Sequence, residues 1–182
     1  MKYSEEELLQ MLRDPKTQRS AFGLMVNQYS EQLYWQVRRI VLNHDDADDV
    51  MQNALLKAWN NLGNFRSDSK LTTWLYRIVI NESLDFIRRQ KHQQTISADA
   101  VDSSVANQLM ADSYFDGNLT EARLQEAIAL LPEVQRTVFT LRYYDEMKYS
   151  EMSRILDTSE GALKASYHIA VKKIYEYFHQ HD

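Results

Sequence analysis

The sequence predicts an all-α protein made of two small helical domains joined by an acidic linker. Three observations lead to this prediction. Apolar residues recur at spacings of three and four along most of the chain, which is the period of an amphipathic helix. The 182 residues include only 4 Gly and 2 Pro, fewer turn-forming residues than a β protein of this length needs. A chain of this length can bury the cores of two small domains.

The first domain is expected over residues 1–92 and the second over residues 119–182. Helices are predicted in the first domain over 4–13, 18–41, 46–62 and 70–91. The linker, residues 93–118, contains four aspartates but no Lys or Arg, and shows little periodicity. We therefore expect it to be flexible, with one short helical turn near 104–111.

Composition limits the classes of function. The chain has no Cys, which excludes disulfides, thiolate metal sites and Cys nucleophiles. No apolar run approaches the roughly 20 residues needed to span a bilayer, and the amino terminus lacks the features of a signal peptide. We therefore expect a cytoplasmic protein without membrane insertion. The net charge of −5 argues against tight autonomous binding to nucleic acid, although it allows local basic patches.

The stretch NHDDADDVMQNALLKAW, residues 43–59, predicts a helix with two different faces. The face predicted to turn inward contains Met51, Ala54, Leu55, Ala58 and Trp59. The opposite face gathers acids, amides and one leucine: Asp45, Asp49, Gln52, Asn53, Leu56 and Asn60. Capping and the helix dipole explain Asp45 or Asp46 at a helix start. They do not explain an exposed leucine among polar residues, which is typical of a protein interface.

The same stretch also allows a metal-dependent phosphohydrolase built on His44, Asp45 and Asp48. Such helical sites need several His and Asp ligands from several helices. None of the other histidines forms a second His-Asp pair at ligand spacing. We therefore expect no catalytic residues, no metal and no cofactor.

The helix predicted over 70–91 carries a polar stripe between two apolar faces. The stripe contains Lys70, Trp74, Arg77, Asn81 and Arg88, and Arg89 extends its charge. Cations suit phosphates and an amide suits a base edge. The preceding loop, residues 64–70, offers Phe65 and Arg66 to an unstacked base. The alternative is a core helix whose basic residues favour the negative end of the helix dipole.

The second domain has the layout of a helix-turn-helix. Pro132 is expected to start one helix, and Ser150 is placed to cap a short helix over 151–156. A turn over 157–159 follows, in which Asp157 tolerates a left-handed backbone and Ser159 is placed to cap the last helix. A short helix, a tight turn and a longer helix are typical of this motif.

The last helix is predicted to have an inward stripe and an exposed face. The inward stripe contains Leu163, Tyr167, Ala170, Ile174 and Phe178. The opposite face presents Gly161, Ala165, His168 and Lys172, with Lys164 and Lys173 at its edges. Small residues allow close approach to a groove, and the others supply donors and charge. The alternative is a surface helix with a few lysines and no DNA contact.

Three segments resemble the signature regions of bacterial sigma factors of the sigma-70 class: DADDVMQNALLKAW, FRSDSKLTTWLYRIVINESLDFIRRQ and YSEMSRILDTSEGALKASYHIAVKK. They occur in the family's order, and no third folded region separates them. That arrangement resembles the extracytoplasmic-function (ECF) group. The resemblance implies a sigma factor that binds core RNA polymerase and directs promoter-specific transcription initiation, rather than an enzyme.

The resemblance also implies roles for the two domains. The region 2-like domain, residues 1–92, would dock on the clamp helices of the largest polymerase subunit and would recognise and melt the −10 element. The region 4-like domain, residues 119–182, would contact the flap of the second-largest subunit and read the −35 element. Implied partners are core polymerase, promoter DNA and an anti-sigma protein. An acidic linker would be a plausible mimic of a phosphate backbone in polymerase channels, or simply a soluble tether.

Family positions carry over to individual residues of this chain. Asp49 and Gln52 match polymerase contacts, and Asn81 matches an asparagine near the flipped base. The remaining matched positions are phosphate contacts at Arg77, Arg88 and Arg89, and contacts of the recognition helix, 159–173, at Lys164, Ser166 and His168.

The chain also departs from the family pattern. Arginines common in the recognition helix are replaced by Ser166, Ile169 and Val171, and a common acid by Asn53. A common turn glycine is Asp157 here. The −35 sequence therefore cannot be borrowed from better-known members.

A stand-alone helix-turn-helix regulator is the alternative function. It would account for residues 119–178 but not for the segments 45–59 and 64–91.

Overall fold

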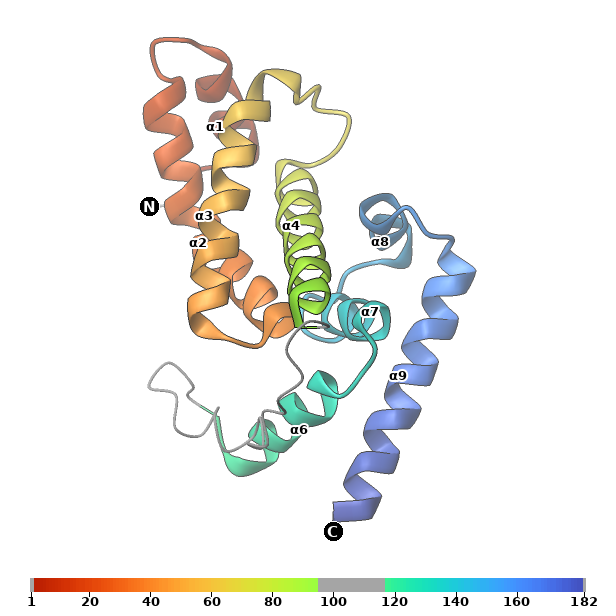
Figure 1. Ribbon diagram of the computed structural model, residues 1–182. Coiled ribbons are helices and arrows are strands. Elements are labelled where there is room, and N and C mark those ends of the chain that lie inside the picture. The colour runs from red at the N-terminus through yellow and green to blue at the C-terminus, as the bar shows by residue number, and fades with distance from the viewer. Residues whose placement is uncertain (1, 95–116, 182) are drawn as a thin grey trace. The chain divides into compact units, whose positions relative to one another are not determined.

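The computed structural model describes residues 2–94 and 117–181 (Figure 1). These residues contain eight α-helices, one short 3-10 helix and no strand, which confirms the predicted all-α class. Residue contacts divide the chain into two compact units, Met1–Ile87 and Arg88–Asp182. Most of the predicted linker, including its helical turn near 104–111, lies outside the described residues, and the predicted domain boundaries remain predictions.

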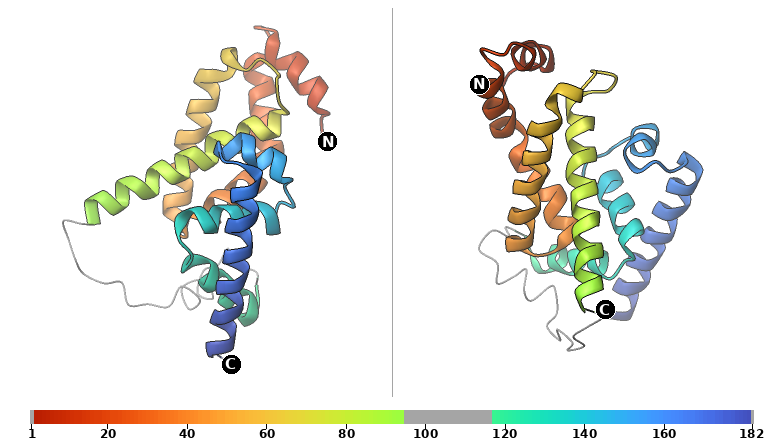
Figure 2. Two further views of the ribbon diagram at one scale, coloured as in Figure 1. Left: turned by 90° about the vertical axis from the view of Figure 1, so that its right-hand side faces the viewer. Right: turned by 45° about the horizontal axis from the view of Figure 1, so that its top comes forward.

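The first unit is a helical bundle (Figures 1 and 2). Its elements are α1 (Glu5–Arg13), α2 (Gln18–Val41), α3 (His44–Asn61), the 3-10 helix η1 (Leu62–Asn64) and most of α4 (Leu71–Gln94). The predicted ranges agree with these bounds to within three residues. Large apolar side chains from α1, α2 and α4 are fully buried: Leu8, Met25, Ile40, Leu71, Leu75 and Ile80. α3 contributes Ala47 and Val50, which are also fully buried.

Local sequence explains where these helices begin. Ser4 and Glu7 form a capping box at α1, in which the Ser4 N–H donates to the Glu7 carboxylate at 2.7 Å. This bond and a second one from the Ser4 hydroxyl lower the pKa of Glu7. α3 begins at His44, because the Asn43 side chain accepts from the Asp46 N–H at 3.2 Å. The prediction that Asp45 or Asp46 caps this helix is therefore wrong, although both acids occupy its first turn, where the dipole favours them.

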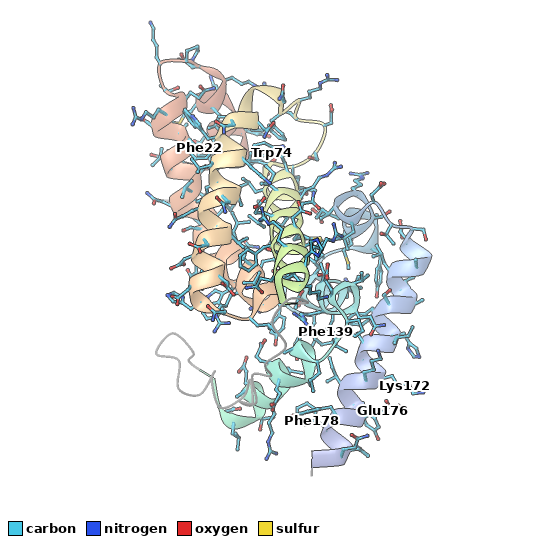
Figure 3. The ribbon with its side chains drawn as sticks, in the orientation of Figure 1. Phe22, Trp74, Phe139, Lys172, Glu176 and Phe178 are labelled. Carbon is cyan, nitrogen blue, oxygen red and sulfur yellow. The ribbon has the colours of Figure 1, made fainter. Side chains whose placement is uncertain are left out.

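The second unit contains four described helices in addition to the end of α4. They are α6 (Leu119–Ala129), α7 (Glu133–Tyr143), α8 (Tyr149–Leu156) and α9 (Glu160–His181). α9 packs against each of the other three. The core between them includes Ile128, Leu131, Phe139, Ala170 and Ile174. The Phe139 ring, labelled in Figure 3, stacks on Tyr143 at 5.1 Å and on Tyr167 at 5.7 Å.

α8 begins two residues earlier than its predicted cap allows. Met147 is buried, and its N–H donates to the Leu141 carbonyl at 3.1 Å. Lys148 is therefore the last extended residue, and the helix starts at Tyr149 with Lys148 as its N-cap. Ser150 lies within the first turn, so the prediction that it caps α8 is wrong. Pro132 likewise occupies the N-cap of α7, one residue before its predicted place.

A hydrogen bond between α9 and α6 yields a prediction about stability. The Tyr177 hydroxyl donates to the Glu126 carboxylate at 2.7 Å. The pKa of Tyr177 is raised to about 12, mainly by burial and secondly by this hydrogen bond. An unfolded tyrosine titrates near about 10. The bond therefore stabilises the fold at neutral pH, and its contribution is expected to fall as the pH rises from about 10 to about 12. Tyr177→Phe should lower the free energy of unfolding by about 1 kcal/mol at pH 7.

Denaturant unfolding at pH 7 and pH 11 checks this expectation, because the difference between wild type and variant should shrink at the higher pH. The matched control is Tyr175→Phe, which removes a hydroxyl of the same helix whose hydrogen bond, to His179 at 3.0 Å, is exposed to solvent and is therefore expected to contribute less. Equal destabilisation by the two substitutions would contradict the proposed contribution of the bond.

Candidate functional site

The outer face of α3 is exposed as the sequence predicts. Leu56 is 61% exposed, and the polar residues around it are also exposed: Asp45, Asp49, Gln52 and Asn53. On the other side Met51, Ala54 and Ala58 are buried and Leu55 is half-buried. The structure therefore presents one large apolar side chain among acids and amides, an arrangement suited to protein contact.

Trp59 departs from its predicted inward position. Its side chain remains 38% exposed. The ring meets Phe22 of α2 edge-on, with centroids 5.0 Å apart. This contact covers one part of the indole and leaves another part in solvent. Phe22 is labelled in Figure 3.

The His44 side chain, at the start of α3, contacts α2. Its Nδ1 atom lies 2.6 Å from the Tyr34 hydroxyl, and its Nε2 atom lies 3.6 Å from the Asp48 carboxylate. Within the described residues, no three His, Asp or Glu side chains are grouped so that they could hold a metal ion. His44 and Asp48 thus take part in contacts within the protein, and the phosphohydrolase interpretation gains no support from the geometry.

The predicted polar stripe on α4 faces solvent. Its cations and amide are exposed: Lys70, Arg77, Asn81, Arg88 and Arg89. Trp74, labelled in Figure 3, is half-buried. It packs on Phe65, with ring centroids 5.0 Å apart and planes tilted by 41°. The structure therefore brings together two aromatic residues that the sequence assigned separately to the loop and to the helix. Arg66 is exposed beside them.

The turn between α8 and α9 confirms the predicted helix-turn-helix geometry. Asp157 adopts the left-handed conformation, with φ 49° and ψ 46°. The Ser159 hydroxyl accepts from the Ala162 N–H at 3.3 Å and so caps α9. These two residues set the direction in which α9 leaves the turn.

The two faces of α9 also match the prediction. Leu163, Ala170 and Ile174 are buried, whereas the proposed contact residues of the opposite face are exposed: Gly161, Lys164, Ala165, His168 and Lys172. Ser166 is half-buried between the two faces. Lys172 lies 3.8 Å from Glu176 one turn later, and Figure 3 labels both residues.

Sequence reasoning missed Tyr149 as part of this surface. The Arg142 guanidinium lies 5.2 Å from the centre of the Tyr149 ring, and the Lys164 ammonium lies 5.6 Å from it. Cations over an aromatic face are attracted to it, so Tyr149 helps to orient Lys164 on α9. No spacing along the chain indicates this contact, because it joins residues of three different helices.

Comparison with known proteins agrees with these features. The model for sigma-70 region 2 matches residues 25–93, and the model for sigma-70 region 4 matches residues 121–174. The ECF RNA polymerase sigma factor SigW of Bacillus subtilis is 30% identical over 161 residues, covering 84% of this chain and 86% of SigW. The ECF RNA polymerase sigma-E factor of Escherichia coli is also 30% identical over 161 residues, covering 84% of each chain.

Solved structures show the same fold. The sigma factor RpoE in complex with the anti-sigma factor NepR from Bartonella quintana matches with a TM-score of 0.69 and 22% identity, covering 86% of this chain and 96% of RpoE. CnrH in complex with the cytosolic domain of CnrY also gives a TM-score of 0.69, at 21% identity, covering 98% of this chain and 96% of CnrH.

Two helical units, one carrying a helix-turn-helix and the other a cationic helix face, define a DNA-binding transcription protein. The chain belongs to the sigma-70 family of RNA polymerase sigma factors, in the extracytoplasmic-function group. It is therefore a transcription initiation factor that directs RNA polymerase to promoters. The stand-alone regulator is not favoured, because the family matches cover both units rather than the helix-turn-helix alone.

Proposed function

We propose a division of labour between the two domains of this sigma factor. Residues 1–92 dock on the clamp helices of the largest polymerase subunit and recognise and melt the −10 element. Residues 119–182 contact the flap of the second-largest subunit and read the −35 element, and residues 93–118 link the two. The proposal rests mainly on the exposure of the proposed polymerase and DNA contacts. Most of these side chains face solvent on α3, α4 and α9. The three helices lie largely inside the segments that match regions 2 and 4.

Each surface has its own contact residues. The polymerase-binding surface is the outer face of α3, with Leu56 at its centre. The −10 surface combines the loop residues Phe65 and Arg66 with the α4 stripe, where cations suit phosphates and Asn81 suits a base edge. The −35 surface is the exposed face of α9, where Gly161 and Ala165 allow close approach of the helix to the major groove.

Transcription in vitro with core polymerase and a promoter library tests this proposal. The library should carry random bases at the −10 and −35 positions, and sequencing of the transcripts should recover preferences at both. Transcripts with no preference at either element would contradict it. Binding of the protein alone to specific DNA at nanomolar concentration and physiological salt would instead favour a stand-alone regulator.

We also propose an anti-sigma partner and a cytoplasmic location. The RpoE structure of the same fold is a complex with an anti-sigma factor, and polymerase and promoter DNA are cytoplasmic in bacteria. In the described part of the chain, no helix is both long enough and apolar enough to cross a bilayer.

A prediction for His168 tests the −35 assignment. Its exposed ring lies on the proposed recognition face, one turn beyond Lys164 and Ala165. A well-placed side chain contributes about 1–3 kcal/mol of base discrimination, so His168→Ala should reduce preference at one −35 base pair by about 5- to 150-fold. Transcription from a panel of −35 variants measures this change. His179→Ala, which removes an exposed histidine nearer the end of the same helix, is the control, and an unchanged rank order for His168→Ala would refute the assignment.

A further inference from the structure

The helix α1 contacts the loop that precedes α4 at two points, its middle and the residue at which it joins α4. The Arg13 guanidinium donates to the Ser67 hydroxyl at 2.7 Å, and the Glu5 carboxylate accepts from the Leu71 N–H at 2.8 Å. Figures 1 and 2 show α1, in red, at the end of the first unit where α3 ends and the loop leads into α4. Each bond includes a charged partner, and such bonds are stronger than those between neutral groups.

The loop needs such support at both points. Ser67 has a φ of 59°, a left-handed conformation that costs a residue other than glycine about 1 kcal/mol or more. The Arg13 bond favours this conformation over the alternatives. Where the loop ends, Leu71 is the first residue of α4, and its N–H is one of the donors that have no partner within the helix. The Glu5 carboxylate satisfies that donor and also suits the positive end of the helix dipole.

α1 is itself fastened to the rest of the unit. The Tyr3 N–H donates to the Gln28 side chain and the Gln28 amide donates to the Tyr3 carbonyl, both at 2.9 Å. Leu8 and Leu12 are buried. The contacts to the loop therefore come from an anchored element rather than from a loose terminus.

We propose that α1 is a brace for this loop and that Glu5 and Arg13 are positioning residues for −10 recognition and melting. They touch no DNA themselves. They hold the segment that carries Phe65 and Arg66, together with the first turn of α4, in the geometry that contacts the unstacked strand. A preorganised loop loses less conformational freedom on binding. This inference rests on the proposed function of the loop and of the α4 stripe.

Hydrogen exchange of the free protein tests the brace independently of transcription. Glu5→Ala and Arg13→Ala should each speed exchange in peptides covering residues 65–71 by about tenfold, because each loses a charge-assisted bond. Glu5→Gln keeps an oxygen that can accept from the Leu71 N–H but loses the charge, so its exchange should be slower than that of Glu5→Ala and faster than that of wild type. Glu6→Ala and Arg19→Ala are matched controls, because they remove exposed side chains of the same types nearby. Unchanged loop exchange in both brace variants would overturn the inference.

Transcription in vitro provides the second readout. The brace variants should bind core polymerase as wild type does, yet form open complexes about tenfold more slowly. Glu5→Gln should form open complexes faster than Glu5→Ala, because it keeps an acceptor for the Leu71 N–H. Faster loop exchange combined with unchanged open-complex formation would overturn the inference.

Asn81→Ala tests the proposed role of the α4 stripe separately from the proposed role of α1. It leaves both brace contacts in place but removes an amide of the α4 stripe. If Asn81→Ala left −10 preference unchanged, the proposed role of the stripe would fail. If it altered −10 preference while the brace variants formed open complexes at the wild-type rate, only the brace would be refuted.

Discussion

Replacing Asp49 by lysine is expected to weaken binding to core RNA polymerase by about 10- to 100-fold and to leave the fold intact. Asp49 is exposed on the outer face of α3, and within the described residues its side chain makes no hydrogen bond or ion pair. Its replacement therefore removes no known contact within the protein. In the proposed interface, however, reversal of the charge would place a cation where the polymerase surface complements an acid, and like charges across an interface are strongly unfavourable.

Titration of labelled protein with core polymerase measures this affinity, and far-UV circular dichroism checks the helical content. Glu31→Lys is the matched control, because it makes the same charge change at an exposed position of α2. If Asp49→Lys bound polymerase as tightly as Glu31→Lys does, the outer face of α3 would not be the docking surface.

The second large effect is expected at Leu163, the buried side chain nearest the start of the proposed recognition helix. Leu163 is 1% exposed and lies in the second turn of α9. Truncation to alanine in a packed core costs about 2–5 kcal/mol, because the cavity collapses only partly. A small helical unit has little stability to spare. Leu163→Ala should therefore lower the stability of the second unit and reduce −35-dependent transcription.

The positions of the tryptophans allow unfolding of the first unit to be measured separately from unfolding of the second. All 3 lie in the first unit, at Trp35, Trp59 and Trp74, so their fluorescence reports unfolding of that unit. Hydrogen exchange in peptides from α6 to α9 reports the second unit. We expect Leu163→Ala to accelerate that exchange and to leave the tryptophan transition close to wild type. Lys164→Ala is the comparison, because it removes a proposed DNA contact from the adjacent exposed position and should change stability by less than about 0.5 kcal/mol.

Leu163 is buried and its neighbour Lys164 is exposed, and periodicity along the sequence predicts this difference. Backbone hydrogen bonds of a helix are local, so the side chains three and four apart must share a face. This is why the buried side of α9 and the exposed Leu56 of α3 could both be predicted. Cap residues were predicted less well. The start of α8 depends on the buried Met147 as well as on the residues of the helix itself, and the cap predicted at Ser150 is wrong.

Contacts between distant segments leave no such periodic signal. Two cations, one from α7 and one from α9, lie over the Tyr149 ring. Glu5 reaches the start of α4 across 66 positions of sequence. Neither position is distinguished by its local pattern, because an acid in the first turn of a helix and a tyrosine beside a cap are both ordinary. Only packing of the helices makes these residues neighbours of proposed contact residues.

The sequence by itself determined the all-α class, the approximate helix bounds, the helix-turn-helix and the faces that α3, α4 and α9 turn to solvent. All of these follow from short-range hydrogen bonding and from the separation of apolar and polar side chains. Tertiary structure alone decided that Phe65 packs on Trp74, that Tyr149 supports Lys164 and that α1 braces the loop before α4. These contacts depend on how whole helices pack, and packing is set by the shapes of many side chains together rather than by any one segment.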